Sequence, residues 1–260
     1  MKSMCRSLDS RRLRGMTAVL STTLVLTACG GPDDVVRKDS VPAAPAAAIG
    51  QTGTNGQYAN VNGLRMYYEI HGTGKPLVLL HGAFSQTRTD FPVLLPMLTT
   101  NRQVIAIEQQ GHGHTADADR PLTYKRMADD TAELLEQLKI ENADFFGYSM
   151  GGGIALEMAI NHPSLVRRFV YMGGAAYRMD GLYPELIKME STMTADMMKD
   201  TPWKAAYDSV APNRADFPKL VEKIKTLDTK FPGWTAAQVR GIRAPALLIV
   251  VTPTSPGWST

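Results

Sequence analysis

A five-residue segment near the middle of the chain has the residue types of a nucleophilic site. Residues 147–151 read Gly-Tyr-Ser-Met-Gly, which is the pattern G-x-S-x-G. This pattern predicts a sharp turn between a strand and a helix that lifts Ser149 clear of its sheet. A serine hydroxyl is a weak nucleophile at neutral pH, so it needs a base to take its proton. The helix that follows is expected to point amide groups, that of Met150 first, toward negative charge developing on an attacked carbonyl oxygen.

The segments around this turn predict strands that alternate with helices. A hairpin is expected around Asn62-Gly63, because both central positions of such a tight turn need a positive φ. Thr123 is a suitable N-cap for an amphipathic helix that runs to residue 140. Continuous apolar runs predict buried strands; these runs are Pro76–Leu80, Gln103–Ile107, Arg168–Met172 and Ala246–Val251. Strands separated by helices predict an α/β protein with a mainly parallel sheet.

Residues 175–240 differ from the rest, since they combine methionines, two tryptophans and short helical stretches such as Pro218–Leu227. An insertion of this kind between two core strands is expected to form a helical lid with an apolar inner face. The alternative is that its methionines and tryptophans only pack the lid onto the core.

Four motifs in order resemble the α/β-hydrolases, in the neighbourhood of esterases, perhydrolases and C–C hydrolases. Besides G-x-S-x-G, they are His81-Gly82 after a buried strand, the segment Gln110–Thr115, and the segment Asn161–Val166 after the nucleophile helix. The segment Gln110–Thr115 resembles the family pattern R-G-H-G-x-S, with Gln where Arg is common. The resemblance covers about residues 57–251. A serine at position 149 argues against the dehalogenase and epoxide-hydrolase branches, whose nucleophile is Asp.

The resemblance implies an α/β-hydrolase fold and roles for individual residues. Ser149 is the implied nucleophile, and the amides of Ala83 and Met150 are the implied oxyanion donors. His81 is expected to orient its loop rather than to act as the base. The implied substrate is a small molecule with an acyl bond, and the reaction needs no cofactor. No metal is expected at His112 and His114, because no carboxylate or Cys partner stands at ligand spacing.

The acid and the base of the family's triad are missing from the predicted positions. The family order is Ser, acid, His, and the acid usually follows the strand equivalent to Ala246–Val251. Here that strand leads into Thr-Pro-Thr-Ser, and no His follows His162. Asp180 and Asp208 are weak candidates for the acid because they lie on the lid side. We therefore expect a C-terminally incomplete domain that lacks the final strand and helix, with Ala246–Val251 as an exposed edge.

A frameshift is the hypothesis that would account for this tail. One permitted codon set for residues 251–260 encodes Gly-Asp-Pro-Asp in the neighbouring reading frame, which is the expected acid turn. Without its base, the chain is expected to be an inactive or crippled hydrolase.

The N-terminus is predicted to be a secretory signal that ends in a lipid-attachment site. A basic stretch precedes the short apolar run 16–28, which is typical of a secretory signal. Residues 26–29 read Leu-Thr-Ala-Cys and resemble the bacterial lipobox, which implies lipidation of Cys29 after cleavage at residue 28 and a lipid-anchored location in the bacterial cell envelope. An ordinary signal peptide is the alternative. Residues 29–56 then form a Pro/Ala/Gly tether and residues 57–260 the hydrolase domain.

Charge and cysteine content exclude other classes. The first 28 residues hold five of the 28 basic residues but only one of the 25 acidic ones, so the remainder is close to neutral. The basic character therefore gives no argument for nucleic-acid binding. Cys5 and Cys29 cannot form a disulfide framework. Two functions remain open, a lipid-anchored serine hydrolase or a non-catalytic lipid-anchored binding protein, and the substrate bond is an ester, thioester, lactone, peracid or C–C bond.

Overall fold

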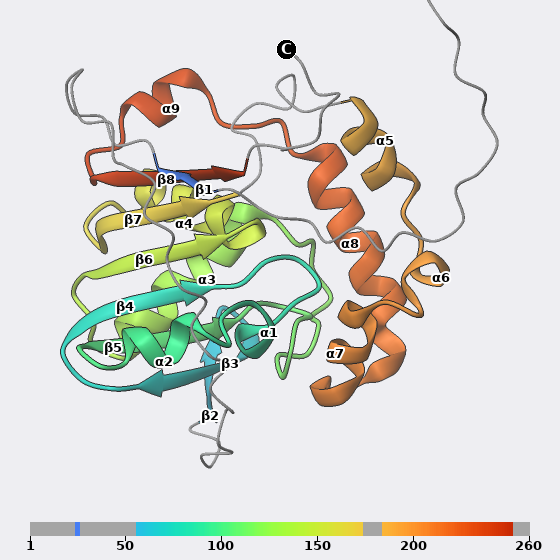
Figure 1. Cartoon of the computed structure of the whole chain (residues 1–260), viewed down its shortest axis with the longest axis horizontal. Helices are drawn as coiled ribbons and strands as arrows, with labels where there is room; N and C mark the ends of the chain where they lie inside the picture. The colour runs from blue at the N-terminus through green and yellow to red at the C-terminus, as the bar shows by residue number, and fades with distance from the viewer. Residues whose placement is uncertain (1–23, 27–55, 174–183, 252–260) are drawn as a thin grey trace, which may run out of the picture.

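Helices pack on both faces of a sheet in the residues that the computed structural model describes, which are 24–26, 56–173 and 184–251 (Figure 1). The parallel part of this sheet consists of β4 (Lys75–Leu80), β5 (Arg102–Glu108), β6 (Ala143–Tyr148), β7 (Val166–Met172) and β8 (Ala246–Val251). All of them except β6 contain a predicted apolar run, and the runs of β4 and β5 are mostly buried, as expected for strands that are covered on both faces.

An antiparallel hairpin extends the sheet at one edge. It is formed by β2 (Gly56–Val61) and β3 (Leu64–His71), and β3 pairs antiparallel with β5. Asn62 and Gly63 have φ values of 46° and 80°, so the two-residue turn is the predicted one. The first strand begins at Gly56, one residue before the predicted start of the domain.

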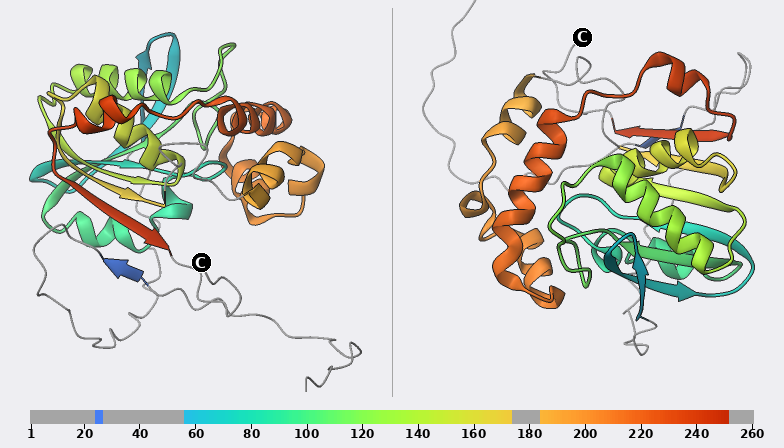
Figure 2. Two further views of the ribbon diagram at one scale, coloured as in Figure 1. Left: turned by 90° about the horizontal axis from the view of Figure 1, so that it is seen from above. Right: turned by 180° about the vertical axis from the view of Figure 1, so that it is seen from behind.

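Helices cover both faces of the sheet (Figure 2). One face carries α3 (Tyr124–Gln137) and α4 (Met150–Asn161), and the other carries α1 (Thr87–Asp90) and α2 (Leu94–Leu98) (Figure 2). The Thr123 hydroxyl accepts a hydrogen bond of 3.1 Å from the Arg126 amide, which confirms the predicted N-cap of α3. The predicted α/β class with a mainly parallel sheet is confirmed.

The chain between β7 and β8 is helical, as predicted. The described helices are α5 (Pro184–Thr192), α6 (Ala195–Met198), α7 (Pro202–Val210), α8 (Phe217–Lys230) and α9 (Ala236–Arg240). The longest, α8, lies at the end of the sheet toward which the parallel strands point (Figure 1). The buried residues of α8 recur with the period of a helix and form one apolar stripe. They are Phe217, Leu220, Val221, Ile224 and Leu227. Residues 175–183 of the predicted lid lie outside the described residues.

The methionines and tryptophans of this insertion have mixed environments. Met198 and Trp234 are buried in the core cluster, whereas Trp203 is 52% exposed. Met189 and Met197 are also exposed. The interpretation as packing residues therefore holds for some of these side chains and not for others.

The outer edge of β8 is paired, which contradicts the predicted exposed edge. The short strand β1 (Leu24–Leu26) lies antiparallel to β8, with Val25 opposite Val250. The strands then follow the order β1-β8-β7-β6-β4-β5-β3-β2. The prediction was wrong because it treated residues 16–28 only as a leader. No helix among the described residues is long and apolar enough to cross a membrane. The predicted lipid site Cys29 and most of the leader and tether lie outside those residues.

Candidate active site

Ser149 occupies a strained bend between β6 and α4. Its backbone has φ 51° and ψ −118°, a conformation that residues other than Gly rarely adopt. The Ser149 amide donates to the Met172 carbonyl at 2.8 Å, which ties the bend to the end of β7. The side chain itself is partly exposed.

Both glycines of G-x-S-x-G lie so close to neighbouring backbone atoms that no other residue fits there. A Cβ at Gly147 would overlap the carbonyl oxygen of Gly151, and a Cβ at Gly151 would overlap that of Leu80. These contacts bring the start of α4 against the end of β4. The bend therefore forms where the C-terminal ends of two neighbouring parallel strands meet.

The loop after β4 reaches the same place. A Cβ at Gly82 would lie 3.2 Å from the Ser149 Cβ, so the backbone of this loop runs directly beside the serine. Among the described residues, the Ala83 amide has no hydrogen-bond acceptor. Met150 is the first residue of α4, so its amide has no acceptor within the helix. Both predicted oxyanion donors are thus left unbonded by this part of the chain.

His81 is buried and fully engaged on the core side of that loop. Its Nδ1 donates to the Gly82 carbonyl at 2.7 Å, and its Nε2 accepts from the Gln109 amide at 3.0 Å. These two bonds define the neutral tautomer with hydrogen on Nδ1. His81 therefore holds the loop, as expected, and offers no free nitrogen to Ser149.

His112 and His114 point to separate partners. The His112 Nδ1 donates to the Gln110 carbonyl at 3.0 Å, and the His114 Nδ1 donates to the Glu108 carboxylate at 2.8 Å. Complete burial, together with the nearby His81, lowers the pKa of His112 to about 3. His112 is thus a neutral core residue. No group of three metal-ligating side chains occurs in the described part of the chain.

The other two histidines lie on ion pairs away from the bend. The His71 Nε2 donates to Glu69 at 2.7 Å, and this bond is the main reason that the pKa of Glu69 falls to about 2. His162, the C-cap of α4, donates from Nε2 to Asp129 at 3.0 Å. Each of the five histidines of the sequence is therefore bonded to a partner other than Ser149.

Neither of the two residues considered for the acid of the triad is placed beside Ser149 by the described part of the structure. Asp208 lies on α7 and pairs with Lys204 of the same helix. Asp180 lies outside the described residues.

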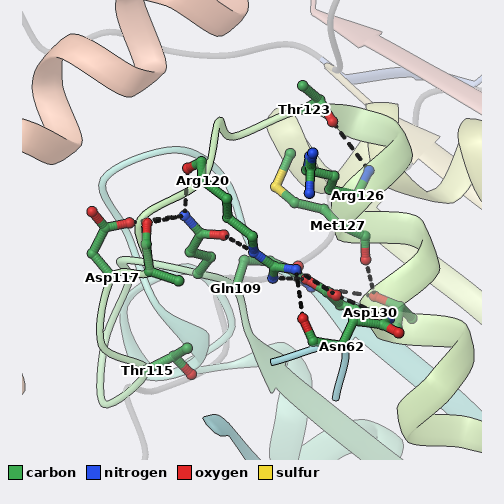
Figure 3. Close-up of polar contacts among 12 residues, drawn as sticks. Asn62, Gln109, Thr115, Asp117, Arg120, Thr123, Arg126, Met127 and Asp130 are labelled. Atoms are coloured by element: carbon green, nitrogen blue, oxygen red, sulfur yellow. Dashed lines mark hydrogen bonds and ion pairs between the residues drawn. The ribbon is translucent and has the colours of Figure 1, made fainter. Parts of the chain in front are cut away.

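A polar network that sequence reasoning missed links the loop after β5 to α3 (Figure 3). The Gln110 side chain donates to Asp117 at 2.8 Å and accepts from the Arg120 Nε at 2.7 Å. Arg120 also pairs with the buried carboxylate of Asp130 and donates to the Asn62 carbonyl at 3.1 Å. The guanidinium of Arg120 thus lies against the side chain of Gln110, which occupies the position where the family pattern commonly has Arg.

Sequence reasoning also missed a half-buried carboxyl group on α8, that of Asp228. Burial, followed by the charge of Glu190 on α5, raises the pKa of Asp228 to about 7. Asp228 and Glu190 in turn contribute to raising the pKa of the buried Tyr124. A partial signal was present in the sequence, because Asp228 follows Ile224 by four residues, but it lies one residue beyond the predicted helical stretch Pro218–Leu227.

An open groove of about 710 Å³ lies elsewhere, along α3 and the turn after α4. Charged side chains such as Arg126, Glu133 and Lys139 line it, and neither the serine bend nor the loop after β4 contributes. The groove is therefore separate from the candidate active site.

Comparison with known proteins places this architecture in a family. A family model described as the alpha/beta hydrolase fold matches residues 75–235. The chain therefore belongs to the α/β-hydrolase fold family, as its motifs implied.

Individual relatives share only part of their length with the chain. It is similar to 2-hydroxymuconate semialdehyde hydrolase of Pseudomonas sp. strain CF600, with 38% identity over 116 residues that cover 44% of this chain and 41% of the relative. Human serine hydrolase BPHL is 35% identical over 143 residues, which cover 53% of this chain and 49% of the relative. The chain thus spans less than two thirds of the length of these relatives.

Solved structures share the fold over a longer stretch. An N-acyl homoserine lactone degrading enzyme matches with a TM-score of 0.58 and 25% identity over 74% of this chain and 80% of that one. An enol-lactonase from Burkholderia xenovorans LB400 matches with a TM-score of 0.55 and 24% identity over the same shares of the two chains, 74% and 80%. The second likeness supports the fold alone.

Proposed function

We propose that this chain is a serine hydrolase that cleaves an ester or similar acyl bond through Ser149. The observation that carries the proposal is the left-handed backbone at Ser149, between two glycines that leave no room for a Cβ. Strain of this kind persists only where the surroundings enforce it, and it clusters at functional sites. The hydrolase names of the relatives support the same reaction class.

The proposed reaction is acyl transfer to the serine and then to water. The Ser149 oxygen attacks the carbonyl carbon and gives its proton to a base, while the carbonyl electron pair moves to oxygen. The Ala83 and Met150 amides hold this oxyanion, and loss of one such donor typically costs about 10²–10³ in kcat. Collapse of the intermediate expels the leaving group with a proton, and water releases the acid. Water and a small acyl substrate are the only reactants that this scheme needs.

This scheme needs a base to accept the Ser149 proton, and no histidine of the sequence is available for that role. A histidine usually fills that role, but all five imidazoles of the sequence are engaged elsewhere. Loss of the base in a serine triad costs on the order of 10⁶ in kcat and leaves about 10³–10⁴ over water. We therefore propose that the chain, as given, is inactive or crippled.

The engaged histidines also favour a second candidate function. A non-catalytic, lipid-anchored binding protein would retain the pocket without the proton relay. The intact bend at Ser149 favours the hydrolase, because a binding protein has no use for a strained serine.

Covalent labelling separates the two functions. Because the oxyanion donors remain while the base is missing, a fluorophosphonate probe should modify the purified chain at Ser149 slowly, over a prolonged incubation, with no labelling of Ser149→Ala. Hydrolysis of p-nitrophenyl acetate should be slow and should disappear in the same variant. Absence of labelling at saturating probe would favour the binding protein, whereas rapid turnover would refute the proposed loss of activity.

We further propose a lipid anchor at Cys29. The Leu-Thr-Ala-Cys sequence behind a basic and apolar leader supports it, and more than one acyl chain gives stable attachment. An alkyne-tagged fatty acid fed to a bacterial host should label the chain and not Cys29→Ser. Equal labelling of both, or of neither, would refute the anchor.

A further inference from the structure

Helix α8 contacts the loop that carries the proposed oxyanion donor. Phe217, its fully buried first residue, has its ring centroid 6.3 Å from that of Phe84. The Tyr207 ring packs on Phe217 at 5.0 Å, and the Lys204 ammonium lies 5.3 Å from the Phe217 centroid. Phe84 directly follows Ala83, so the contact falls one residue from the proposed oxyanion donor.

The backbone at Phe84 needs such a support. Its φ of 61° is unusual for a large side chain. On the core side the loop is fixed at residue 82, where the Gly82 amide donates to Asp90 at 2.7 Å and its carbonyl accepts from His81 at 2.7 Å and from Ser85 at 2.9 Å. It is fixed again at residue 85, where the Ser85 hydroxyl lies 2.5 Å from the Asp90 carboxylate. The backbone of Ala83 and Phe84 makes no hydrogen bond to any described residue. Between the bonded residues 82 and 85, side-chain packing on Phe84 is therefore the remaining contact that can direct the Ala83 amide.

A second contact holds α8 against the core. The Lys223 ammonium lies 2.8 and 2.7 Å from the two Asp117 carboxylate oxygens and 2.6 Å from the Ala118 carbonyl. Both side chains of this ion pair are largely shielded from solvent. Asp117 is itself held by Gln110, which belongs to the network of Figure 3. The ion pair thus joins α8 to the loop after β5, which is itself held by the hydrogen bond from Gln110 to Asp117.

We propose that α8 positions the oxyanion hole: Phe217 holds Phe84 in its left-handed conformation and so directs the Ala83 amide toward Ser149, while the Lys223–Asp117 ion pair keeps α8 docked. This inference rests on the proposed serine hydrolase function. Phe217 and Lys223 are positioning residues, because they act through the loop and not on the substrate.

Hydrogen exchange tests the structural half without any need for activity. In the full chain, Phe217→Ala should speed exchange of the Gly82 amide about tenfold or more, because the released loop opens away from Asp90. Phe217→Leu should restore most of the protection, and Trp203→Ala, on an exposed lid residue, should leave it unchanged. Equal protection of Gly82 in Phe217→Ala and Trp203→Ala would overturn the inference.

The kinetics of fluorophosphonate labelling test the functional half. Lys223→Met should lower the maximal labelling rate of Ser149 roughly 10- to 100-fold, with little change in half-saturating probe, since the phosphonyl oxygen occupies the oxyanion hole. Lys219→Met, on the solvent face of the same helix, is the matched control and should label normally. The conservative variant Lys223→Arg should retain much of the rate, because its guanidinium can still donate to the Asp117 carboxylate and the Ala118 carbonyl.

The outcomes separate the two proposals. Failure of the unaltered chain to label would count against the serine hydrolase, and the exchange experiment would still decide the role of α8. Normal labelling rates in Lys223→Met would refute the inference and leave the hydrolase intact.

Discussion

The strained backbone at Ser149 predicts that glycine at this position stabilises the fold. With φ 51° and ψ −118°, the residue lies in a region that costs of order 1–3 kcal/mol for a side chain with a Cβ. Ser149→Gly removes this cost, and the greater freedom of glycine in the unfolded chain offsets about 0.5–1 kcal/mol of the gain. Ser149→Ala keeps the strain and loses the same hydroxyl. We expect Ser149→Gly to be more stable than Ser149→Ala by about 1 kcal/mol.

Thermal unfolding followed by circular dichroism measures this difference. For a domain of this size, 1 kcal/mol corresponds to roughly 2–4 °C in Tm. The matched control is the pair Glu222→Ala and Glu222→Gly at an exposed position within α8, where glycine should be the less stable variant by about 1 kcal/mol. The sign should therefore reverse between the two positions. A Tm of Ser149→Gly at or below that of Ser149→Ala would refute the assignment of strain to this residue.

Packing and burial give three further predictions. Gly151→Ala should lower Tm by several degrees or prevent folding, because its Cβ would overlap the Leu80 carbonyl; an unchanged Tm would show that the backbone at this contact yields easily. Burial raises the pKa of Asp228 to about 7 in the fold from 3.8, so its contribution to stability is fully present below pH 3.8 and is lost progressively as pH rises from 3.8 to about 7. The Tm of Asp228→Asn should consequently exceed that of the unaltered chain at pH 8 and approach it at pH 5, and parallel pH profiles would count against this. Trp234→Phe should cost about 1–2 kcal/mol, since it leaves the buried Glu157 carboxylate without its indole donor, and an equal Tm would show that the bond contributes little.

The features that sequence predicted best depend on local patterns. The buried strands and the N-cap at Thr123 follow from short runs of residue types, and their bounds differ from the prediction by one or two residues. The bend at Ser149 follows from glycine spacing, because the backbone can approach so closely only where no Cβ intervenes. Local chemistry was enough for these elements since neighbours along the chain decide them.

The features that sequence missed depend on residues far apart. Lys223 and Asp117 are separated by 106 positions, and nothing in either segment indicates the other. The pairing of Leu24–Leu26 with β8 was missed because a short apolar run fits a leader and a strand equally well. Such contacts are settled by the packing of whole elements, which residue types do not specify.

The exchange of roles between Gln110 and Arg120 constrains how this loop can change. The Gln110 oxygen accepts the Arg120 Nε–H, and a guanidinium at position 110 would offer donors only. An arginine introduced there alone would leave that donor without its acceptor and bring two like charges together. An arginine at position 110 is therefore expected to be tolerated only when position 120 has also changed, so the two positions are coupled.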